Sequence, residues 1–583
     1  MKSYLRDNRT SLYRALGVFA LLVLAMAFPD SIGVNIAAAA PLLAFGLGET
    51  SPAVLELFKG TPWRPGVDPM VGINTMKKAL FQDDGRPNAI PYELLKSRYG
   101  QTLQKSFTQS ASATSGLTQY DLEQGAKLLY PVTTIFRNMI PRVTGGLGIQ
   151  ANWRSVTAIN PGQTNIGLSE GHRGAAMNQT VVDRLAAFKT SGFDNFVTEQ
   201  AYLSAVTFED LMALAATTTL QGTMEGEEHL DIGGNSSLLL GTLGTVTGSD
   251  VVSGGYLADA TYSVIGVALT YLGMVNSTPP TEASGGALSG GAVALPYTRS
   301  NMDGSTDLIQ GFSGIQSAAT SVTVNGGGTA QSIAASVTPV RGAIGYAWYL
   351  QSGGTGSERL VKITGYPSAV LTNTNSTGQL ATALPASDTS TNSLNYDGML
   401  TQMLTSGSGA YWADLGGQPL TTAGSGSGGI TEFNTALAAF YDNYRLIPTD
   451  IFMNGYDQKA AAAIVLTGNT NLAPFFMGQN SSGGLNGSTT LTRYMNPIGF
   501  GNTELNVHAH PFIPRGTIIF YSRTNPYPLS NVPALIRSLC RRDYWQVDWP
   551  VTTLQRTLGV YFDKVLQMYF NPAFGVITGV KSA

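Results

Sequence analysis

The chain has 583 residues, of which 34 are Lys or Arg and 37 are Asp or Glu, giving a net charge of −3. Charged residues make up only 12% of the sequence, against about a quarter in ordinary soluble domains, while hydrophobic residues reach 43%. This composition excludes a disordered chain and a protein that holds nucleic acid on a strongly basic face. The single cysteine, Cys540, excludes an intrachain disulfide and a multi-cysteine metal site. Two classes remain: exported, β-rich surface proteins and subunits of large assemblies. At about 150 residues per domain, the length predicts three or four domains.

The N-terminal region has the layout of a signal peptide. An uncharged apolar run at residues 15–28 follows four cations, Lys2, Arg6, Arg9 and Arg14. As a helix this run would reach about 21 Å, short of the roughly 30 Å that a bilayer requires, so we predict no membrane span. The alanine-rich residues 34–44 could supply a cleavage site. The same segment could instead form a helical hairpin of an N-terminal arm, and both interpretations stay open.

The middle of the chain is poor in charge and rich in strand patterns. Residues 276–430 hold 4 cations and 7 acids, together with many Gly, Ser and Thr. β-Branched and aromatic runs separated by Gly/Asn/Ser clusters predict strands at residues 262–272, 318–324, 333–340, 344–350 and 360–364. Trp348, beside Tyr346 and Tyr349, is expected to anchor their core. The pattern resembles immunoglobulin-like or fibronectin-type sandwiches without their cysteine pair and covers about residues 240–395.

Helices are predicted on both sides of this region. Thr207 to Asp210 has the spacing of a capping box, and apolar residues at helical spacing follow it, so we expect a long helix that ends near Ile232. Gly222 and Gly226 predict a bend or a break in it. Further helices are predicted at residues 432–444 and 457–465.

Few residues suggest catalysis or metal binding. His508 and His510 lie on one face of an expected strand, but no third ligand is spaced to complete a metal site, so we favour a partly exposed strand pair. An acidic cluster late in the long helix could bind Ca²⁺, although a solvated face or ion pairs with arginines of a neighbouring subunit is favoured. It consists of Glu225, Glu227, Glu228 and Asp231.

The remaining motifs also favour structural roles. Residues 424–429 match G-x-G-x-x-G but follow no apolar strand, so we interpret them as a flexible loop. Cys540 has neighbouring arginines that could lower its pKa, yet an inert buried thiol is the commoner case. A basic patch is assigned to contacts between subunits, and it contains Arg537, Arg541 and Arg542. We therefore predict no catalytic, cofactor-binding or metal-binding residues, no cofactor, and no enzymatic activity.

The order of several segments resembles the major capsid proteins of tailed bacteriophages with the Hong Kong 97 fold. The stretches LYPVTTIFRNMIPR (129–142) and IQANW (149–153) resemble the N-terminal arm, and residues 171–197 lie where the extended E-loop of that family does. Residues 205–236, which end in LDIGGNS, resemble its spine helix. NYDGML (395–400) and LIPTDIFMN (446–454) are similar to its axial domain. Residues 507–521, RDYW (542–545) and YFNPAFGVITG (569–579) are similar to its peripheral strands and closing strand.

This resemblance implies an α+β capsid fold that carries an inserted all-β immunoglobulin-like sandwich. The implied parts are an N-terminal extension (1–120), the N-arm, E-loop and spine helix (121–236), the sandwich (237–395), the axial domain (396–506), and the peripheral strands with the C-terminus (507–583). The net charge of +5 over residues 1–150 suggests that the N-terminal region faces inward. Some members of the family join subunits through a Lys–Asn isopeptide bond, and Lys189 is the only lysine of the E-loop region. Without an identified partner, it does not predict such a cross-link.

The implied function is self-assembly into hexamers and pentamers that form the icosahedral shell of a virion around double-stranded DNA. The implied partners are copies of the chain, scaffold, portal or decoration proteins, and DNA bound without sequence specificity, with no membrane. The structural alternative is an exported β-rich surface protein with a cleaved signal peptide. A third hypothesis is a hydrolase that uses His508 or His510.

Overall fold

The computed structural model describes residues 132–159, 165–205, 209–423, 429–467, 490–525, 527 and 530–581. The chain divides into two compact units, Met1–Glu123 and Gln124–Ala583, and the description below concerns the second. The basic N-terminal segment, the apolar run at 15–28, Thr207 and most of the glycine motif at 424–429 lie outside the described residues.

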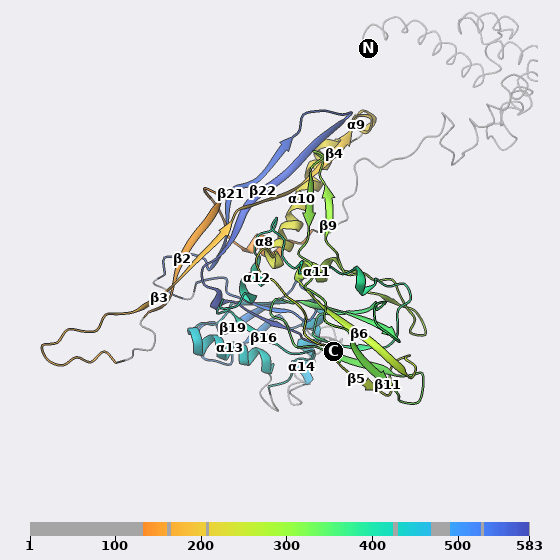
Figure 1. Cartoon of the computed structure of the whole chain (residues 1–583). Helices are drawn as coiled ribbons and strands as arrows, with labels where there is room; N and C mark the ends of the chain where they lie inside the picture. Colours follow the sequence, from red (N-terminus) through yellow and green to blue (C-terminus); the bar gives the residue numbers. More distant parts are fainter. Residues whose placement is uncertain are drawn as a thin grey trace, which may run out of the picture. The chain divides into compact units, whose positions relative to one another are not determined.

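A four-stranded sheet forms one part of this unit (Figure 1). Its strands lie in the order β1 (Arg142–Thr144), β21 (Ile536–Asp548), β22 (Gln555–Met568) and β4 (Lys189–Thr198). β1 runs parallel to β21, and the other pairs are antiparallel. The short helix α8 (Ile135–Met139) precedes β1, and α9 (Glu199–Ala205) follows β4.

The long helix α10 (Leu211–Gly233) packs on this sheet against β4 and β22. Its N-cap is Asp210, whose carboxylate accepts hydrogen bonds from the backbone N–H groups of Met212 and Ala213, both at 3.1 Å. The helix is continuous, so of the bend or break predicted at Gly222 and Gly226 the break does not occur. Packing against the sheet explains the difference, because tertiary contacts outweigh the small helix-propensity cost of two glycines.

A sandwich of two antiparallel sheets follows α10. One sheet has the order β11 (Thr320–Val324), β6 (Ala260–Leu269), β13 (Gly345–Ser352) and β14 (Arg359–Thr364). The other has the order β15 (Ser368–Leu371), β12 (Ser332–Ser336) and β5 (Thr247–Val251). One hydrophobic cluster draws side chains from both sheets, and Trp348 lies fully buried within it. The predicted strands and their aromatic anchor are therefore confirmed.

The connectivity of the sandwich differs from the immunoglobulin order. In an immunoglobulin domain the first, second, fourth and fifth strands share one sheet. Here, among the seven strands of the two sheets, the first, fourth and seventh (β5, β12 and β15) share a sheet. The expectation of an immunoglobulin-like domain therefore holds for the two-sheet layering but not for the chain path. Alternating strand patterns indicate that strands exist, but long-range pairing decides which strands become neighbours.

A mixed six-stranded sheet forms the third part. Its order is β16 (Tyr411–Asp414), β23 (Gly575–Thr578), β20 (Ile518–Tyr521), β17 (Asp450–Met453), β19 (Glu504–Ala509) and β18 (Arg493–Met495). Three helices accompany it in the chain: α12 (Met399–Leu404), α13 (Thr431–Tyr444) and α14 (Gly455–Thr467). α13 and α14 confirm the helices predicted at 432–444 and 457–465.

Some of the C-terminal strands belong to the six-stranded sheet and the others to the four-stranded sheet. β19, β20 and β23 belong to the six-stranded sheet, whereas β21 and β22 belong to the four-stranded one. The predicted division at residue 507 therefore does not follow the sheets, because the chain leaves one sheet for a long hairpin and then returns. The largest hydrophobic cluster spans this crossing and includes side chains from both sheets and from α8.

The other described elements are short. They are α11 (Tyr271–Asn276), β7 (Thr281–Glu282), β8 (Leu288–Ser289), β9 (Tyr297–Ser300), β10 (Thr306–Ile309), η2 (Ala381–Ala383) and η3 (Asn571–Ala573). The last two strands, β2 (Gln150–Ile159) and β3 (Gln179–Ala187), pair only with each other and form an extended hairpin.

Candidate functional site

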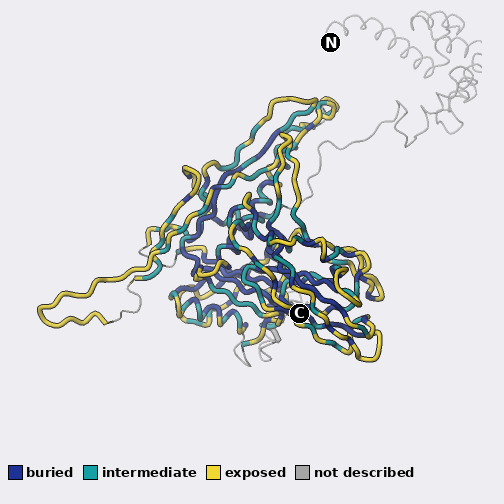
Figure 2. Tube along the Cα trace, in the orientation of Figure 1, coloured by how far each residue is buried: buried dark blue, intermediate teal, exposed yellow. Residues whose placement is uncertain are grey.

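The hairpin β2–β3 contacts the rest of the fold at its base, and its far end is exposed to solvent. Trp153 donates a hydrogen bond from its indole Nε1 to the backbone oxygen of Met568 at 3.0 Å. Ala151, Phe188 and Val565 form a small buried cluster between the hairpin and the four-stranded sheet. Residues 165–181, between the two strands and at the start of β3, are all exposed, and along the strands themselves exposed residues alternate with half-buried ones (Figure 2).

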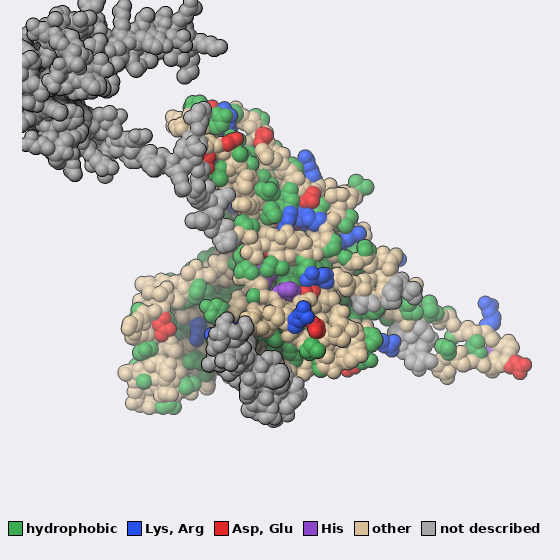
Figure 3. Space-filling view, turned by 180° about the vertical axis from the view of Figure 1, so that it is seen from behind, with side chains coloured by type: hydrophobic (Ala, Val, Ile, Leu, Met, Phe, Trp, Pro, Cys, Tyr) green, Lys and Arg blue, Asp and Glu red, His purple; other side chains and the backbone are tan. Residues whose placement is uncertain are grey.

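Large apolar side chains cover the exposed part of this hairpin and the loop before it. Leu147, Ile149 and Ile166 are 85%, 84% and 84% exposed. Further exposed members are Val156, Ile159, Leu168, Met177 and Leu185. In Figure 3 green side chains recur along the projecting hairpin. We call this set the hairpin surface. A two-stranded ribbon is marginally stable alone, and large apolar side chains this exposed along it favour an interaction surface.

A second apolar surface lies where β4 meets α9 and β21 turns into β22. Its exposed members are Phe193, Phe196, Leu203, Trp549, Val551 and Leu554. The two surfaces are at separate places in the fold, one on the hairpin and one at an end of the four-stranded sheet. A chain with two separate apolar surfaces can contact two neighbours at once, which a ring built from heterologous contacts requires.

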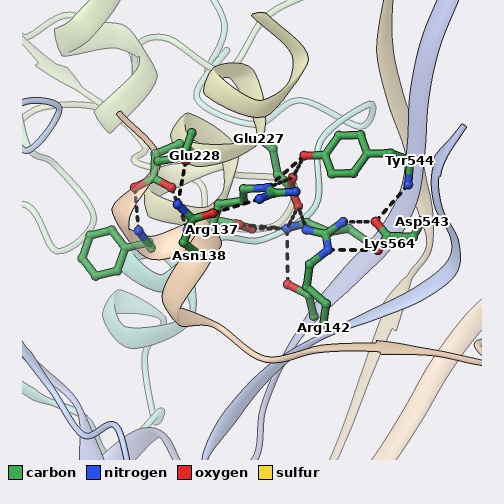
Figure 4. Close-up of polar contacts among 12 residues, drawn as sticks. Arg137, Asn138, Arg142, Glu227, Glu228, Asp543, Tyr544 and Lys564 are labelled. Carbon is green, nitrogen blue, oxygen red and sulfur yellow. Dashed lines mark hydrogen bonds and ion pairs between the residues drawn. The ribbon is translucent and has the colours of Figure 1, made fainter. Parts of the chain in front are cut away.

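Three acids of the cluster at the C-terminal end of α10 are buried, namely Glu227, Glu228 and Asp231, whereas Glu225 is half-buried (Figure 4). Glu227 pairs with Arg142 and Lys564, and the Tyr544 hydroxyl donates to its other oxygen. Asp231 lies 2.6 Å from the Lys564 ammonium. The expectation of a solvated face or of arginines from a neighbouring subunit is therefore wrong for these two acids. Their cations come from the same chain, because β1 and β22 bring Arg142 and Lys564 to the end of α10.

Glu228 connects three segments of the chain. One carboxylate oxygen accepts from the backbone N–H of Phe136 at 2.8 Å, and the other accepts from that of Arg137 at 2.7 Å. His510 lies 2.8 Å from the first oxygen and is fully buried. A single side chain of α10 thus contacts both α8 and the segment after β19. The N-terminal N–H groups of α8 have no partner within the helix, so this acceptor supplies a cap.

Burial and neighbouring charges shift the pKa values of Asp231 and Glu227 in opposite directions. Burial raises the pKa of Asp231 to about 6, although the ammonium of Lys564 acts against the shift. For Glu227, burial favours the neutral form, but the charges of Lys564 and Arg142 outweigh it and lower the pKa below its ordinary value. Glu227 is therefore the ionised member of the pair, and Asp231 is the one that more readily takes up a proton.

The two histidines of the predicted pair have different environments. His508 is partly exposed and bonds to Asp450 at 2.8 Å, while its ring stacks on Phe452. His510 bonds to Glu228 instead, so the expectation of partial exposure is wrong for this residue. No group of three His, Cys, Asp or Glu side chains that could hold a metal occurs in the part of the chain that the structure describes.

The basic patch of β21 mostly contacts its own chain. Arg537 donates to the side chain of Gln567 at 2.8 Å and lies over the ring of Tyr569. Arg541 donates to Asp563 at 2.9 Å. Arg542 lies over the Trp545 ring. Arg537 and Arg541 thus also have partners on the neighbouring strand β22 of the same chain, and the assignment of the patch to contacts between subunits stays a prediction.

Lys189 is also engaged within its own chain. It donates from Nζ to the backbone oxygen of Ser393 at 2.5 Å, and it lies opposite Lys564 in the pairing of β4 with β22. This contact gives no support to a cross-link through Lys189.

Cys540 is expected to be unreactive in the folded protein. Burial raises the pKa of its thiol to about 11, despite the nearby cations Arg142 and Lys564. At pH 8 about one thiol in a thousand is then ionised, against roughly a quarter for an ordinary cysteine. Iodoacetamide labelling followed by mass spectrometry should therefore be slow on folded protein and fast in guanidinium chloride. Equal rates in both conditions would contradict the prediction.

Sequence reasoning missed most members of the two apolar surfaces and the cations of the buried cluster. One signal was available, because Lys564 stands in an otherwise largely apolar run of β22, where a charge must find a buried partner. Among the described residues, no helix is long and apolar enough to cross a bilayer.

No protein-family model matches the sequence, and neither does any curated protein. Similar chains occur among solved structures of capsids. One is the capsid of an empty GTA particle, with 8% identity, coverage of 79% of this chain and 94% of that chain, and a TM-score of 0.34. A second is the capsid of Myoviridae phage XM1, with 7% identity, coverage of 81% of this chain and 100% of that chain, and a TM-score of 0.34. A structure of Mycobacterium phage Bobi has 9% identity, coverage of 78% of this chain and 95% of that chain, and a TM-score of 0.33. The function proposed below rests on the residues of this chain.

Proposed function

We propose that this chain is the major capsid protein of a tailed virus, a structural subunit without catalytic activity that is located in the virion shell. The observation that carries the proposal is the hairpin surface. Its base is fixed to the four-stranded sheet by Trp153 and Phe188, while Leu147, Ile149 and Ile166 face solvent in the single chain. A firmly anchored projection with exposed apolar side chains fits a subunit whose hairpin packs on a neighbouring subunit.

The arrangement of parts supports the Hong Kong 97 fold. The helix α10 would be the spine helix, the hairpin β2–β3 the E-loop, and α8 with β1 the N-arm. The four-stranded sheet would be the peripheral domain and the six-stranded sheet with its helices the axial domain. The sandwich spanning 237–395 would be an insertion that decorates the shell. Its surface carries few charges, as the mostly tan and green face in Figure 3 illustrates.

In this proposal, copies of the chain assemble into hexamers and pentamers that enclose double-stranded DNA. The hairpin surface of one copy packs on the next, and repetition of that contact closes a ring. Near-neutral charge suits a wall that holds DNA without reading its sequence, and the cations of residues 1–150 would face inward. Scaffold, portal and decoration proteins would be further partners.

Electron microscopy of the purified full chain tests the proposal. We expect rings or closed shells from the unmodified protein. The variant L147S/I149S/I166S should remain folded but stay unassembled, because it removes apolar area that only a neighbour can cover. The control is V252S, which changes a sandwich residue that is 67% exposed and should assemble normally. Monomers from the unmodified protein would contradict the proposal, and monomers that lack about 40 N-terminal residues would support the exported alternative.

A further inference from the structure

A cavity of about 490 Å³ lies where the sandwich meets the six-stranded sheet. The sandwich side supplies the end of β14 and residues of α11, among them Met274 and Val275. The sheet supplies residues that follow β17, β19 and β23, namely Asn454, residues 511–515 and Val580. These three strands run in the same direction, so their C-terminal ends meet at one edge of the sheet. A crevice between two domains is a common place for a ligand site.

A hydrogen bond and a close backbone contact fix the walls of this cavity. Asn454 donates from its side-chain amide to the backbone oxygen of Ile513 at 2.8 Å. At Gly365 a Cβ atom would clash with the backbone oxygen of Arg515, so only glycine lets these two segments approach so closely. The cavity is therefore already formed in the chain without a ligand, and binding does not require these loops to become ordered.

The cavity combines apolar walls with two cations and no acid. Met274, Ile363 and Phe512 contribute apolar surface. Lys362 and Arg515 also line the cavity, and none of its described lining residues is Asp or Glu. Apolar walls favour the hydrocarbon part of a ligand, whereas the cations favour a negatively charged group.

Neither cation forms an ion pair with any residue that the structure describes. The Lys362 ammonium donates to the backbone oxygen of Val370 at 3.0 Å, and the Arg515 guanidinium lies over the ring of Tyr456. An ammonium has three donors and a guanidinium has five, so most of these donors are free to bind a ligand. Burial lowers the pKa of Lys362, against the opposing charge of Glu282, because its ammonium is partly removed from water.

We propose that this cavity binds a small amphipathic carboxylate, a molecule with an apolar body and one negatively charged end. The apolar body lies against Met274, Ile363 and Phe512, and the carboxylate accepts hydrogen bonds from Arg515 and Lys362. An arginine can donate two parallel hydrogen bonds to a carboxylate, and such charged pairs are stronger than neutral ones. A volume of about 490 Å³ is within the range of cavities that hold small ligands. The inference goes beyond the proposed capsid function, and neither depends on the other.

Saturation-transfer NMR titrations of the purified full chain test the site, with phenylbutanoate as the probe and phenylbutanamide as its neutral counterpart. We expect the carboxylate to bind about tenfold more tightly than the amide, because only the carboxylate can pair with the two cations. Equal affinity of the two probes would overturn the proposal, and so would a failure of the carboxylate to bind at millimolar concentration. This comparison requires no variant and therefore does not depend on whether a variant folds.

Two variants then locate the bound probe. R515Q removes the guanidinium charge, so it should weaken phenylbutanoate binding about tenfold and affect the amide little. V275W fills the cavity from a residue that is 41% exposed, so it should abolish binding of the carboxylate. K459Q is the matched control, because Lys459 is an exposed lysine of α14 that does not line the cavity. Undiminished binding by R515Q or V275W would overturn the proposal, and so would an equal loss in K459Q and R515Q.

Discussion

Replacing Glu228 with alanine is expected to lower the free energy of unfolding by about 3–5 kcal/mol. The carboxylate is fully buried and accepts from two backbone N–H groups of α8 and from His510. Its removal leaves three donors in or at the edge of the core without an acceptor. Urea unfolding of the purified protein measures the decrease in the free energy of unfolding. Hydrogen exchange at the amides of Phe136 and Arg137 should also accelerate, which would localise the effect to α8.

The matched control for this change is the ion pair of Arg154 with Asp183 on the hairpin. Both side chains are largely exposed, at 71% and 66%, and bond to each other at the surface. D183A should leave unfolding unchanged, because exposed ion pairs are screened by water. Equal losses for E228A and D183A would contradict the structural role assigned to Glu228.

Replacing Trp348 with alanine is expected to cost about 3–5 kcal/mol in the stability of the sandwich. The indole is completely buried between the two sheets and donates from Nε1 to the hydroxyl of Thr364 at 2.9 Å. Truncation leaves a large cavity and removes a buried hydrogen bond at the same time. Limited proteolysis should then cut within residues 247–371 before it cuts α10, because the sandwich has its own hydrophobic cluster.

W549A provides the comparison for this substitution. Trp549 is 44% exposed beside the turn from β21 into β22, and its removal should hardly change resistance to protease. If W348A resists proteolysis as well as the unmodified chain does, the sandwich core is not organised around this side chain.

Local patterns predicted the regular elements well. The helices at 432–444 and 457–465 and the strands around Trp348 are close to those observed, because their spacing of apolar residues reflects contacts of each element with one core. The burial of Tyr346, Trp348 and Tyr349 follows from the same pattern. These elements could be predicted without knowing which distant residues they contact.

The acidic end of α10 shows where this reasoning fails. Glu227, Glu228 and Asp231 look like a solvated helix face, since nothing nearby in the sequence neutralises them. Their partners are 85 to 333 residues away and include residues of α8 and β1, His510 after β19, and residues of β21 and β22. Acids that were expected to lie on the surface are therefore buried, because distant segments of the chain pack against the end of α10.

Sequence alone determined the composition, the single inert cysteine, most helices and strands, and the resemblance in segment order. Tertiary structure decided the path through the sandwich, the division of β19 to β23 between two sheets, and the burial of Glu227 beside Lys564. The physical reason is the range of the interactions. Helix caps and apolar periodicity act between near neighbours in the chain, whereas strand order and ion pairing depend on which distant segments meet in the folded core.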